Sequence, residues 1–350
     1  MCAGGTTTPI VMCLVVLFCV VTYYNYNMLE KTISYAESNQ RLDKYVKKVL
    51  NDAPLSFVYK LFRKKDVKVN SKPAKIDYKI VTGDVVRIYV TDSQIEDFLN
   101  PITTQGRVLP FPIVYEDDNL LIINKPTNLL VHSDSSSLAK LTLTEHVLAY
   151  LIHTGEYNPR VTSGFIPGPA HRLDRNTTGI VMFGKNVQTL QELNELFKNK
   201  TDLDKFYIAL VVGRIRKDGE INAKLLKDER TNITKVSTAQ YAKTALTKYS
   251  VLKTFADTSL LKVQIITGRT HQIRVHMQSI DHPVVNDGKY GSFDFNREYI
   301  KKFKNEDIFL HAHSVIFNNV EGVLSYLNGT EFIAPLPENK RRILDQLKEE

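Results

Sequence analysis

Apolar runs of strand length recur between residues 113 and 266, and only a few stretches between them show the period of a helix. Residues 114–126 read as an acidic turn that leads into a strand ending at Lys-Pro. Further strands are predicted at 180–183, 206–212, 242–254 and 259–266. Amphipathic helices are predicted at about 138–152 and 187–198. Strands interrupted by so few helices indicate an α+β fold, built on a mostly antiparallel mixed sheet with flanking helices.

Positive charge is concentrated in one short segment. The chain has 350 residues, which suggests about two domains, and its net charge is +8. Residues 41–79 hold 12 Lys/Arg and 4 Asp/Glu, a balance of +8, so the remaining charges balance at 34 against 34. A concentrated basic face is typical of proteins that bind nucleic acid or another polyanion. A solvated face without a partner is the alternative.

This basic segment has the pattern of a small module at residues 28–90. Apolar positions spaced for helices occur at 42–50 and at about 55–64, and strands are predicted at 67–70 and 85–90. The candidate phosphate contacts are Lys60, Arg63, Lys64, Lys65 and Lys68. Residues 91–112 contain three prolines and little periodicity, so we interpret them as a linker to a second domain at 113–350.

The N-terminus differs from the rest of the chain. All three cysteines, Cys2, Cys13 and Cys19, lie there, so no disulfide framework or cysteine-based metal site is expected, and a cytoplasmic location fits. The apolar run at 10–21 is shorter than the ~20 residues that a transmembrane helix needs. We interpret residues 1–27 as a hydrophobic extension upstream of a start at Met28. Membrane anchoring through residues 10–24 is the less favoured alternative.

The chemistry is predicted to centre on residues 171–180, HRLDRNTTGI. Here Asp174 stands between Arg172 and Arg175, after a Gly/Pro-rich loop and before an apolar run. A carboxylate among guanidiniums suits a site that binds a polyanion and uses one acid, although a structural Arg–Asp bridge is the alternative reading. The chain has no Gly-x-Ser-x-Gly elbow, no Walker loop and no GxGxxG, so no cofactor is expected. His311 and His313 are interpreted as structural, and no metal site is predicted.

Two further segments add polar groups. Residues 267–277 read TGRTHQIRVHM, and a helix that begins near Thr270 places Gln272 and His276 on one side. Arg274 and His271 then point elsewhere. Tyr207 lies in a predicted strand, on the face opposite to its neighbours; taken alone, it reads as a packed strand tyrosine.

Together these segments resemble a known family. HRLDRNTTG, KFYIALVVG and TGRTHQIRVHM followed by HPVVNDGKYG resemble the RluA-type pseudouridine synthases, and INKPTNLLVHS is a weaker fourth match. RLDKYV, LFRKKDVKVNSK and GDVVRIYV resemble the S4-like RNA-binding domain. The combination is similar to the subgroup that acts on large-subunit ribosomal RNA. The resemblance covers about residues 40–335.

The resemblance implies an activity and a set of roles. It implies that the protein isomerises specific uridines in RNA, expected to be 23S ribosomal RNA, to pseudouridine without a cofactor and as a monomer. Asp174 would be the essential catalytic residue, Tyr207 a base or a stacking partner, and Arg274 the salt-bridge partner of the aspartate. Arg172 would fill the gap left by the flipped uridine. The remaining substrate contacts would be Arg269, His271 and Leu310.

Two positions depart from the family pattern. Thr178 stands where Ser is usual, and Asn128 stands where a KPxG pattern has Gly. Asn tolerates positive φ better than most residues, so the turn is expected to survive. The competing hypothesis from a different class is a non-catalytic RNA-binding factor for ribosome assembly that keeps the fold.

Overall fold

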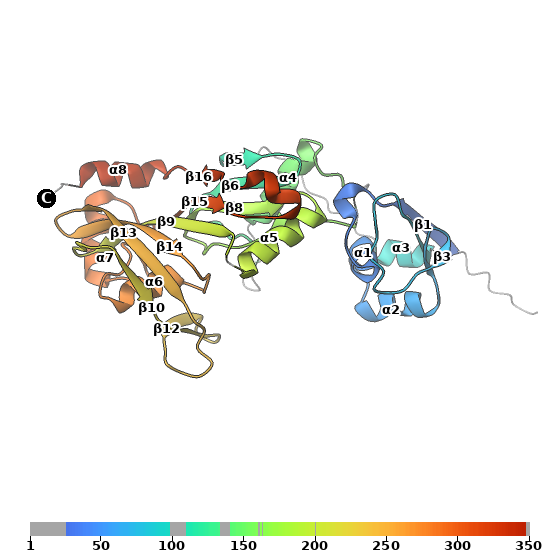
Figure 1. The fold of residues 1–350 in the computed structure, drawn as a ribbon, viewed down its shortest axis with the longest axis horizontal. Helices are drawn as coiled ribbons and strands as arrows, with labels where there is room; N and C mark the ends of the chain where they lie inside the picture. Colours follow the sequence, from blue (N-terminus) through green and yellow to red (C-terminus); the bar gives the residue numbers. More distant parts are fainter. Residues whose placement is uncertain are drawn as a thin grey trace, which may run out of the picture.

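A computed structural model describes residues 26–98, 110–133, 141–159, 162, 164–199 and 201–347. Apart from its last two residues, the predicted N-terminal extension lies outside this part. None of the helices in the described ranges combines the length and apolar character needed to cross a membrane. The molecule is elongated, with a small N-terminal module at one end and a larger body built on a sheet (Figure 1).

The N-terminal module packs two helices on a four-stranded antiparallel sheet. The helices are α1 (Leu42–Val49) and α2 (Leu55–Arg63), as predicted. The sheet order is β1-β4-β2-β3, with strands β1 (Tyr26–Thr32), β4 (Val85–Thr91), β2 (Val67–Val69) and β3 (Lys72–Pro73). Leu42, Val58 and Ile88 are buried in one core, because the apolar side of each helix faces the sheet. β1 begins two residues before Met28 and so includes the end of the predicted extension.

Part of the predicted linker is helical. α3 (Asp92–Phe98) directly follows β4, and Phe98 packs on Phe57 of α2 with ring centroids 4.9 Å apart. The helix has about two turns and buries none of its residues fully, so its sequence carries little helical periodicity. The contact with Phe57 connects α3 to the N-terminal module.

The body contains a ten-stranded mixed sheet, in which the pair β15 and β8 is parallel and the other pairs are antiparallel. The main order is β10-β13-β14-β9-β15-β8-β6-β5, with β16 on β15 and β7 on β8. The strands are β5 (Ile113–Glu116), β6 (Leu120–Lys125), β7 (Gly168–Pro169), β8 (Thr178–Gly184), β9 (Leu203–Val212), β10 (Gly219–Asn222), β13 (Leu246–Thr254), β14 (Thr258–Ile265), β15 (Leu310–Phe317) and β16 (Glu331–Ile333). β6 and β8 are buried along their whole length, which explains the runs of four apolar residues, Leu120–Ile123 and Ile180–Phe183, that they contain.

Helices flank this sheet. They are α4 (Leu143–His153), α5 (Val187–Asn199), α6 (Gln272–Ser279), α7 (Phe293–Phe303) and α8 (Glu338–Gln346), with a 3-10 helix, η2, at Gly322–Leu327. α4 begins at 143 rather than at about 138, because Thr142 and Glu145 form a capping box there. β11 (Leu225–Asp228) and β12 (Ile233–Val236) form a separate hairpin that projects from the body (Figure 1).

The backbone conformation explains which residue types the motifs have at positions 179 and 128. Gly179 has φ +112°, and a Cβ there would lie 2.1 Å from the carbonyl oxygen of Ala312, so only glycine lets β8 approach β15 this closely. Asn128 adopts φ 61°, as expected for an asparagine in the place of glycine.

Candidate active site

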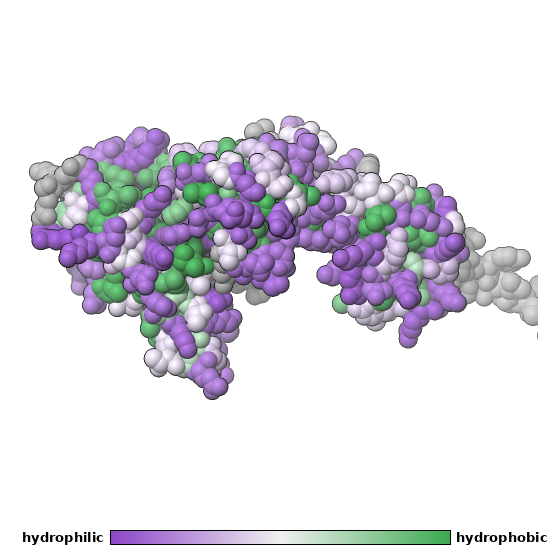
Figure 2. All heavy atoms as spheres, in the orientation of Figure 1, coloured by the Kyte–Doolittle hydropathy of each residue, from purple (hydrophilic) through white to green (hydrophobic). Residues whose placement is uncertain are grey.

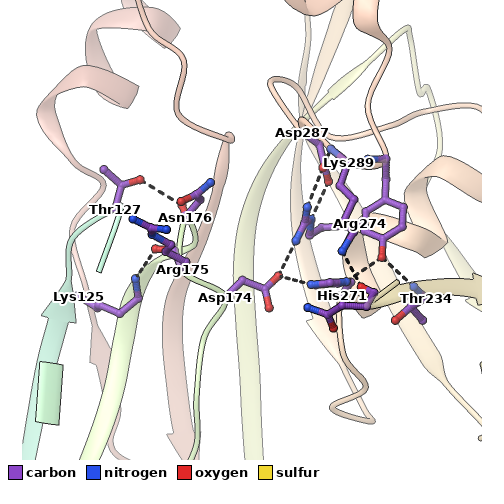
Figure 3. A network of polar contacts seen from close by, with 12 residues as sticks. Lys125, Thr127, Asp174, Arg175, Asn176, Thr234, His271, Arg274, Asp287 and Lys289 are labelled. Carbon is purple, nitrogen blue, oxygen red and sulfur yellow. Dashed lines mark hydrogen bonds and ion pairs between the residues drawn. The ribbon is translucent and has the colours of Figure 1, made fainter. Parts of the chain in front are cut away.

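An ion pair between two distant segments forms the centre of the site. Asp174 lies in the loop between β7 and β8, and Arg274 lies on α6, 100 residues further along the chain. Arg274 Nη1 donates a hydrogen bond of 2.8 Å to Asp174 Oδ2 (Figure 3). The carboxylate side chain is 30% exposed and the guanidinium side chain 13%, so the acid is the more accessible partner. A carboxylate paired and oriented in this way is available to a substrate from one side.

Arg274 is held from behind by a buried carboxylate. Asp287 is completely buried and accepts from Arg274 Nε at 2.7 Å and Nη2 at 2.8 Å. It also accepts from the backbone N–H groups of Lys289 and Tyr290. Burial lowers the pKa of the guanidinium, but its bonds to Asp287 and Asp174 outweigh this, so the net shift is upward. The bidentate clamp therefore fixes which nitrogen reaches Asp174.

His271 forms a second contact around the carboxylate. It precedes α6 with φ 56°, a left-handed conformation that is uncommon outside glycine but more frequent for histidine than for most residues. Its Nδ1 lies 2.7 Å from the Tyr290 hydroxyl, which accepts from the backbone N–H of Thr234 in β12. Its Nε2 lies 3.8 Å from Asp174 Oδ2, too far for a hydrogen bond. Burial lowers the pKa of His271, which favours the neutral ring beside the carboxylate.

A cavity of about 480 Å³ opens onto this pair. Residues predicted from separate motifs line it together: Arg172, Asp174, Tyr207, Arg269, His271, Arg274 and Leu310. Tyr207 comes from β9 and Leu310 from β15, which are adjacent strands. Burial, and then the negative charge of Asp174, raises the pKa of Tyr207, so its phenol keeps its proton.

The alternative reading of Asp174, a structural bridge to an arginine beside it in sequence, is not observed. No ion pair in the described part of the chain joins Asp174 to Arg172 or Arg175. Arg172 is exposed at the cavity wall, and Arg269 donates from Nε to the carbonyl of Thr244. The partner of the acid is Arg274, as the family resemblance implied, and not an arginine adjacent to it in sequence.

The predicted division of α6 into two sides is confirmed. Gln272 and His276 are buried and both bind the Thr247 hydroxyl, at 2.9 Å each. Arg274 points instead toward Asp174. One side of the helix therefore anchors it to β13, and the other presents the cation.

Three residues around the site were not singled out from the sequence. Asp287 and Tyr290 lie in the HPVVNDGKYG segment that contributed to the family resemblance, and an acid shortly after an apolar pair, with one asparagine between them, was the available signal. Lys125, at the end of β6, is fully buried and donates to the carbonyls of Pro126 and Leu129. It also donates to the carbonyl of Arg175 (Figure 3). Burial lowers its pKa to about 7. Lys125 thus ties the loop that carries Asp174 to the neighbouring strand.

The two histidines of β15 make structural contacts. His311 is buried, with Nδ1 2.8 Å from the Thr178 hydroxyl and Nε2 2.9 Å from the carbonyl of Ala334. His313 lies 3.1 Å from the same carbonyl. Since a carbonyl only accepts, Nε2 of His311 carries the ring hydrogen.

The basic residues of the N-terminal module are accessible. Lys60, Arg63, Lys64 and Lys65 are exposed at the end of α2 and beyond it. Lys68 is half-buried, with Nζ 4.7 Å from the ring centroid of Tyr89. Hydrophilic residues predominate on the face of this module that Figure 2 shows. None of these cations lines the cavity around Asp174, so they form a separate surface.

Known proteins resemble this chain in sequence and in fold. A family model described as RNA pseudouridylate synthase matches residues 119–279. Ribosomal large subunit pseudouridine synthase C of Vibrio parahaemolyticus is 36% identical over 286 residues, which cover 81% of this chain and 86% of the relative. The Escherichia coli protein of the same name is 32% identical, over 90% of this chain and 95% of its own length.

A solved structure supports the fold. Human RNA Pseudouridylate Synthase Domain Containing 4 matches with a TM-score of 0.53 and 24% identity, over 67% of this chain and 93% of its own. The predicted α+β class is confirmed by this likeness and by the mixed sheet. The identity of the relatives over most of the chain confirms the predicted family. The chain therefore belongs to the RNA pseudouridylate synthase family.

Proposed function

We propose that this protein converts uridines of large-subunit ribosomal RNA to pseudouridine, with Asp174 as the catalytic residue. The observation that carries the proposal is the ion pair of Asp174 with Arg274 at the wall of the cavity. The names of the relatives, ribosomal large subunit pseudouridine synthases, support the choice of RNA. We expect a monomeric, cytoplasmic enzyme.

The reaction needs one well-placed acid and no external reagent. The bond between N1 of uracil and C1′ of ribose breaks, the base rotates, and a bond forms between C5 and C1′. C5 then loses its proton and N1 gains one, so atoms and electrons balance without oxidation. An ionised carboxylate can serve as nucleophile or base at the sugar. Arg274 supports this role because it holds Asp174 in one orientation and offsets its repulsion from the phosphates of RNA.

The other cavity residues suit a uridine taken out of its helix. The Tyr207 ring offers a face for the base, and its protonated phenol can donate a hydrogen bond. Leu310 supplies apolar surface in the same cavity. Extruding a nucleotide costs a few kcal/mol. Arg172, exposed at the wall, suits the place that the base vacates, because a guanidinium plane stacks on nucleobases.

Two polar residues complete the proposed substrate contacts. His271 stands beside Asp174 and, as a neutral ring, suits hydrogen bonding to the base or the sugar. Arg269 keeps nitrogen donors beyond the one bound to Thr244, and these suit a phosphate at the cavity wall.

The N-terminal module supplies a second RNA contact in this proposal. The exposed cations after and within α2 suit phosphate oxygens, and their binding energy comes largely from counterion release. Such contacts position RNA without reading its sequence. Selection of the uridine then depends on the cavity and on where the module holds the rest of the RNA.

Mapping pseudouridine in ribosomal RNA tests the proposal. A strain that lacks this gene should lose pseudouridine at one or more positions of the large-subunit RNA. Wild-type protein should restore them, and Asp174→Asn should not, because an amide is neither a nucleophile nor a base here. Asp294→Asn, which changes an exposed carboxylate on α7, is the matched control.

Each contrary result has a distinct meaning. An unchanged map after deletion refutes the activity on ribosomal RNA. Restoration of the modified positions by Asp174→Asn refutes the catalytic role of that residue. Growth or assembly defects that Asp174→Asn rescues, without restoring pseudouridine, would support the non-catalytic assembly factor instead.

A further inference from the structure

The N-terminal module is attached to the body by buried polar groups. Glu37 and Gln40 are 1% and 3% exposed, and both bind Gly164 of the body. The backbone N–H of Gly164 donates to Glu37 Oε1 at 2.9 Å, and its carbonyl accepts from Gln40 Nε2 at 2.9 Å. The N–H and the carbonyl of Gly164 are therefore both hydrogen-bonded to side chains of the N-terminal module. Losing either partner would leave a buried polar group unpaired.

Glu37, Gln40 and Tyr45 form a socket around Gly164, and its two polar residues are held in place by further hydrogen bonds. The second oxygen of Glu37 accepts from the Ser34 hydroxyl at 2.8 Å, and Gln40 Nε2 also donates to the Glu37 carbonyl at 2.7 Å. Gln40 Oε1 accepts from Lys48 at 2.8 Å. Every polar atom of the Gln40 side chain is therefore used, and Glu37 is fixed on both oxygens. A buried hydrogen-bond network in which the polar groups are satisfied favours one arrangement of its side chains over the alternatives.

Packing adds a steric constraint at the same point. A Cβ on Gly164 would lie 2.0 Å from Cε2 of Tyr45, which is fully buried in the core of the N-terminal module. Phe165, also buried, lies beneath Lys48, with Nζ 5.7 Å from the ring centroid. The absence of a side chain at 164 is what lets the two modules meet this closely.

A second strip of contacts lies on α5. Gln188 Nε2 donates to the Ser38 hydroxyl at 3.1 Å, and Gln191 Nε2 donates to the carbonyl of Asn39 at 3.2 Å. Contacts at two separated places restrict rotation as well as translation. The N-terminal module is therefore held in a defined orientation, not merely tethered.

The position of Gly164 connects this contact to catalysis. The segment from Gly164 runs through β7 directly into the loop that carries Asp174. We propose that the socket of Glu37, Gln40 and Tyr45 fixes the distance between the basic surface of α2 and the catalytic cavity, and so determines which uridine of a bound RNA reaches Asp174. This inference rests on the proposed function. These are positioning residues, since none of them lines the cavity.

The consequence for RNA selection follows from geometry. RNA bound to a rigidly held surface presents only nucleotides at a fixed distance to the cavity, whereas a freely tethered module presents many. Release of the module should therefore affect large RNA, which spans both surfaces, more than a short stem–loop that occupies the cavity alone. A merely structural contact would affect both substrates equally.

Two variants of the full chain release the module from opposite sides. Gly164→Ala introduces a methyl group against Tyr45, and Gln40→Ala removes the hydrogen bond to the Gly164 carbonyl. Gln346→Ala, on the exposed face of α8, is the matched control. Small-angle X-ray scattering should show a larger radius of gyration for both variants than for wild type and control. Thermal melting identifies a variant that fails to fold, in which case the other one decides.

Pseudouridine formation is then compared on two RNAs, intact large-subunit RNA and a stem–loop that contains only the modified uridine. We expect kcat/KM on intact RNA to fall about tenfold, with new modification at neighbouring uridines, and the stem–loop rate to stay at its wild-type value. Unchanged scattering, or unchanged selectivity in a released variant, overturns the inference. Wild-type protein that modifies neither RNA refutes the proposed function, and with it the selectivity role, so the two failures are distinguishable.

Discussion

The clamp of Asp287 on Arg274 predicts a large effect from a small change. Asp287→Asn keeps the size of the side chain but removes its charge and turns one acceptor into a donor that faces the guanidinium. At least one of the two bonds to Arg274, at 2.7 and 2.8 Å, is lost. Because Asp287 is fully buried, water cannot replace the lost partner. Breaking a buried pair from one side costs about 3 kcal/mol or more.

Activity should fall for a second reason. Without the clamp, Arg274 can rotate, and Asp174 loses the partner that orients it. A misplacement of about 1 Å near reacting groups costs about 100-fold in rate. We therefore expect Asp287→Asn to reduce kcat by about that factor, even in the folded fraction.

Urea unfolding and single-turnover pseudouridine formation measure the two effects separately. Asp294→Asn is the control, because its carboxylate is 84% exposed and pairs only with Arg297 among the residues described. Wild-type kcat in a folded Asp287→Asn protein would refute the view that the clamp positions the catalytic pair. Wild-type stability would refute the assigned cost of the buried charge.

Two further predictions concern pH and salt. Burial lowers the pKa of His311 to about 4, below about 6.5 in the unfolded chain, so its stabilising contribution is complete above pH 6.5 and is lost as pH falls toward 4. Between about pH 8 and pH 5, the free energy of unfolding of the wild-type protein should fall by about 2 kcal/mol because of this group, and that of His311→Gln should lack this fall. Urea unfolding at both pH values measures the difference, and an equal pH dependence of the two proteins would contradict the prediction. Replacing Lys60 and Arg63 by Ala should reduce the slope of log affinity against log salt by about 2, measured by RNA binding at several ionic strengths. An unchanged slope would remove α2 from the RNA surface.

Much of the local structure was predictable because it depends on local patterns. In the N-terminal module, the spacing of apolar residues predicts the helices to within a few residues of their observed bounds. The apolar runs of β6 and β8 likewise indicate buried strands. The separate sides of α6 follow from its 3.6-residue period alone. The short α3 was missed because two turns without a buried residue leave almost no periodic signal.

The sequence by itself determined which residue types meet at the site: the motifs around Asp174, Tyr207 and Arg274 carry the chemistry and the family. The family resemblance also implied Arg274 as the partner of the acid, whereas the spacing of the residues did not, and only the tertiary structure showed what holds Arg274. The acid turns away from the adjacent arginines to Arg274, which in turn is held by Asp287. The same is true of the socket at Gly164, which joins segments more than a hundred residues apart. Periodicity reports which side of an element is buried, whereas the partner of a charge depends on which elements the sheet brings together.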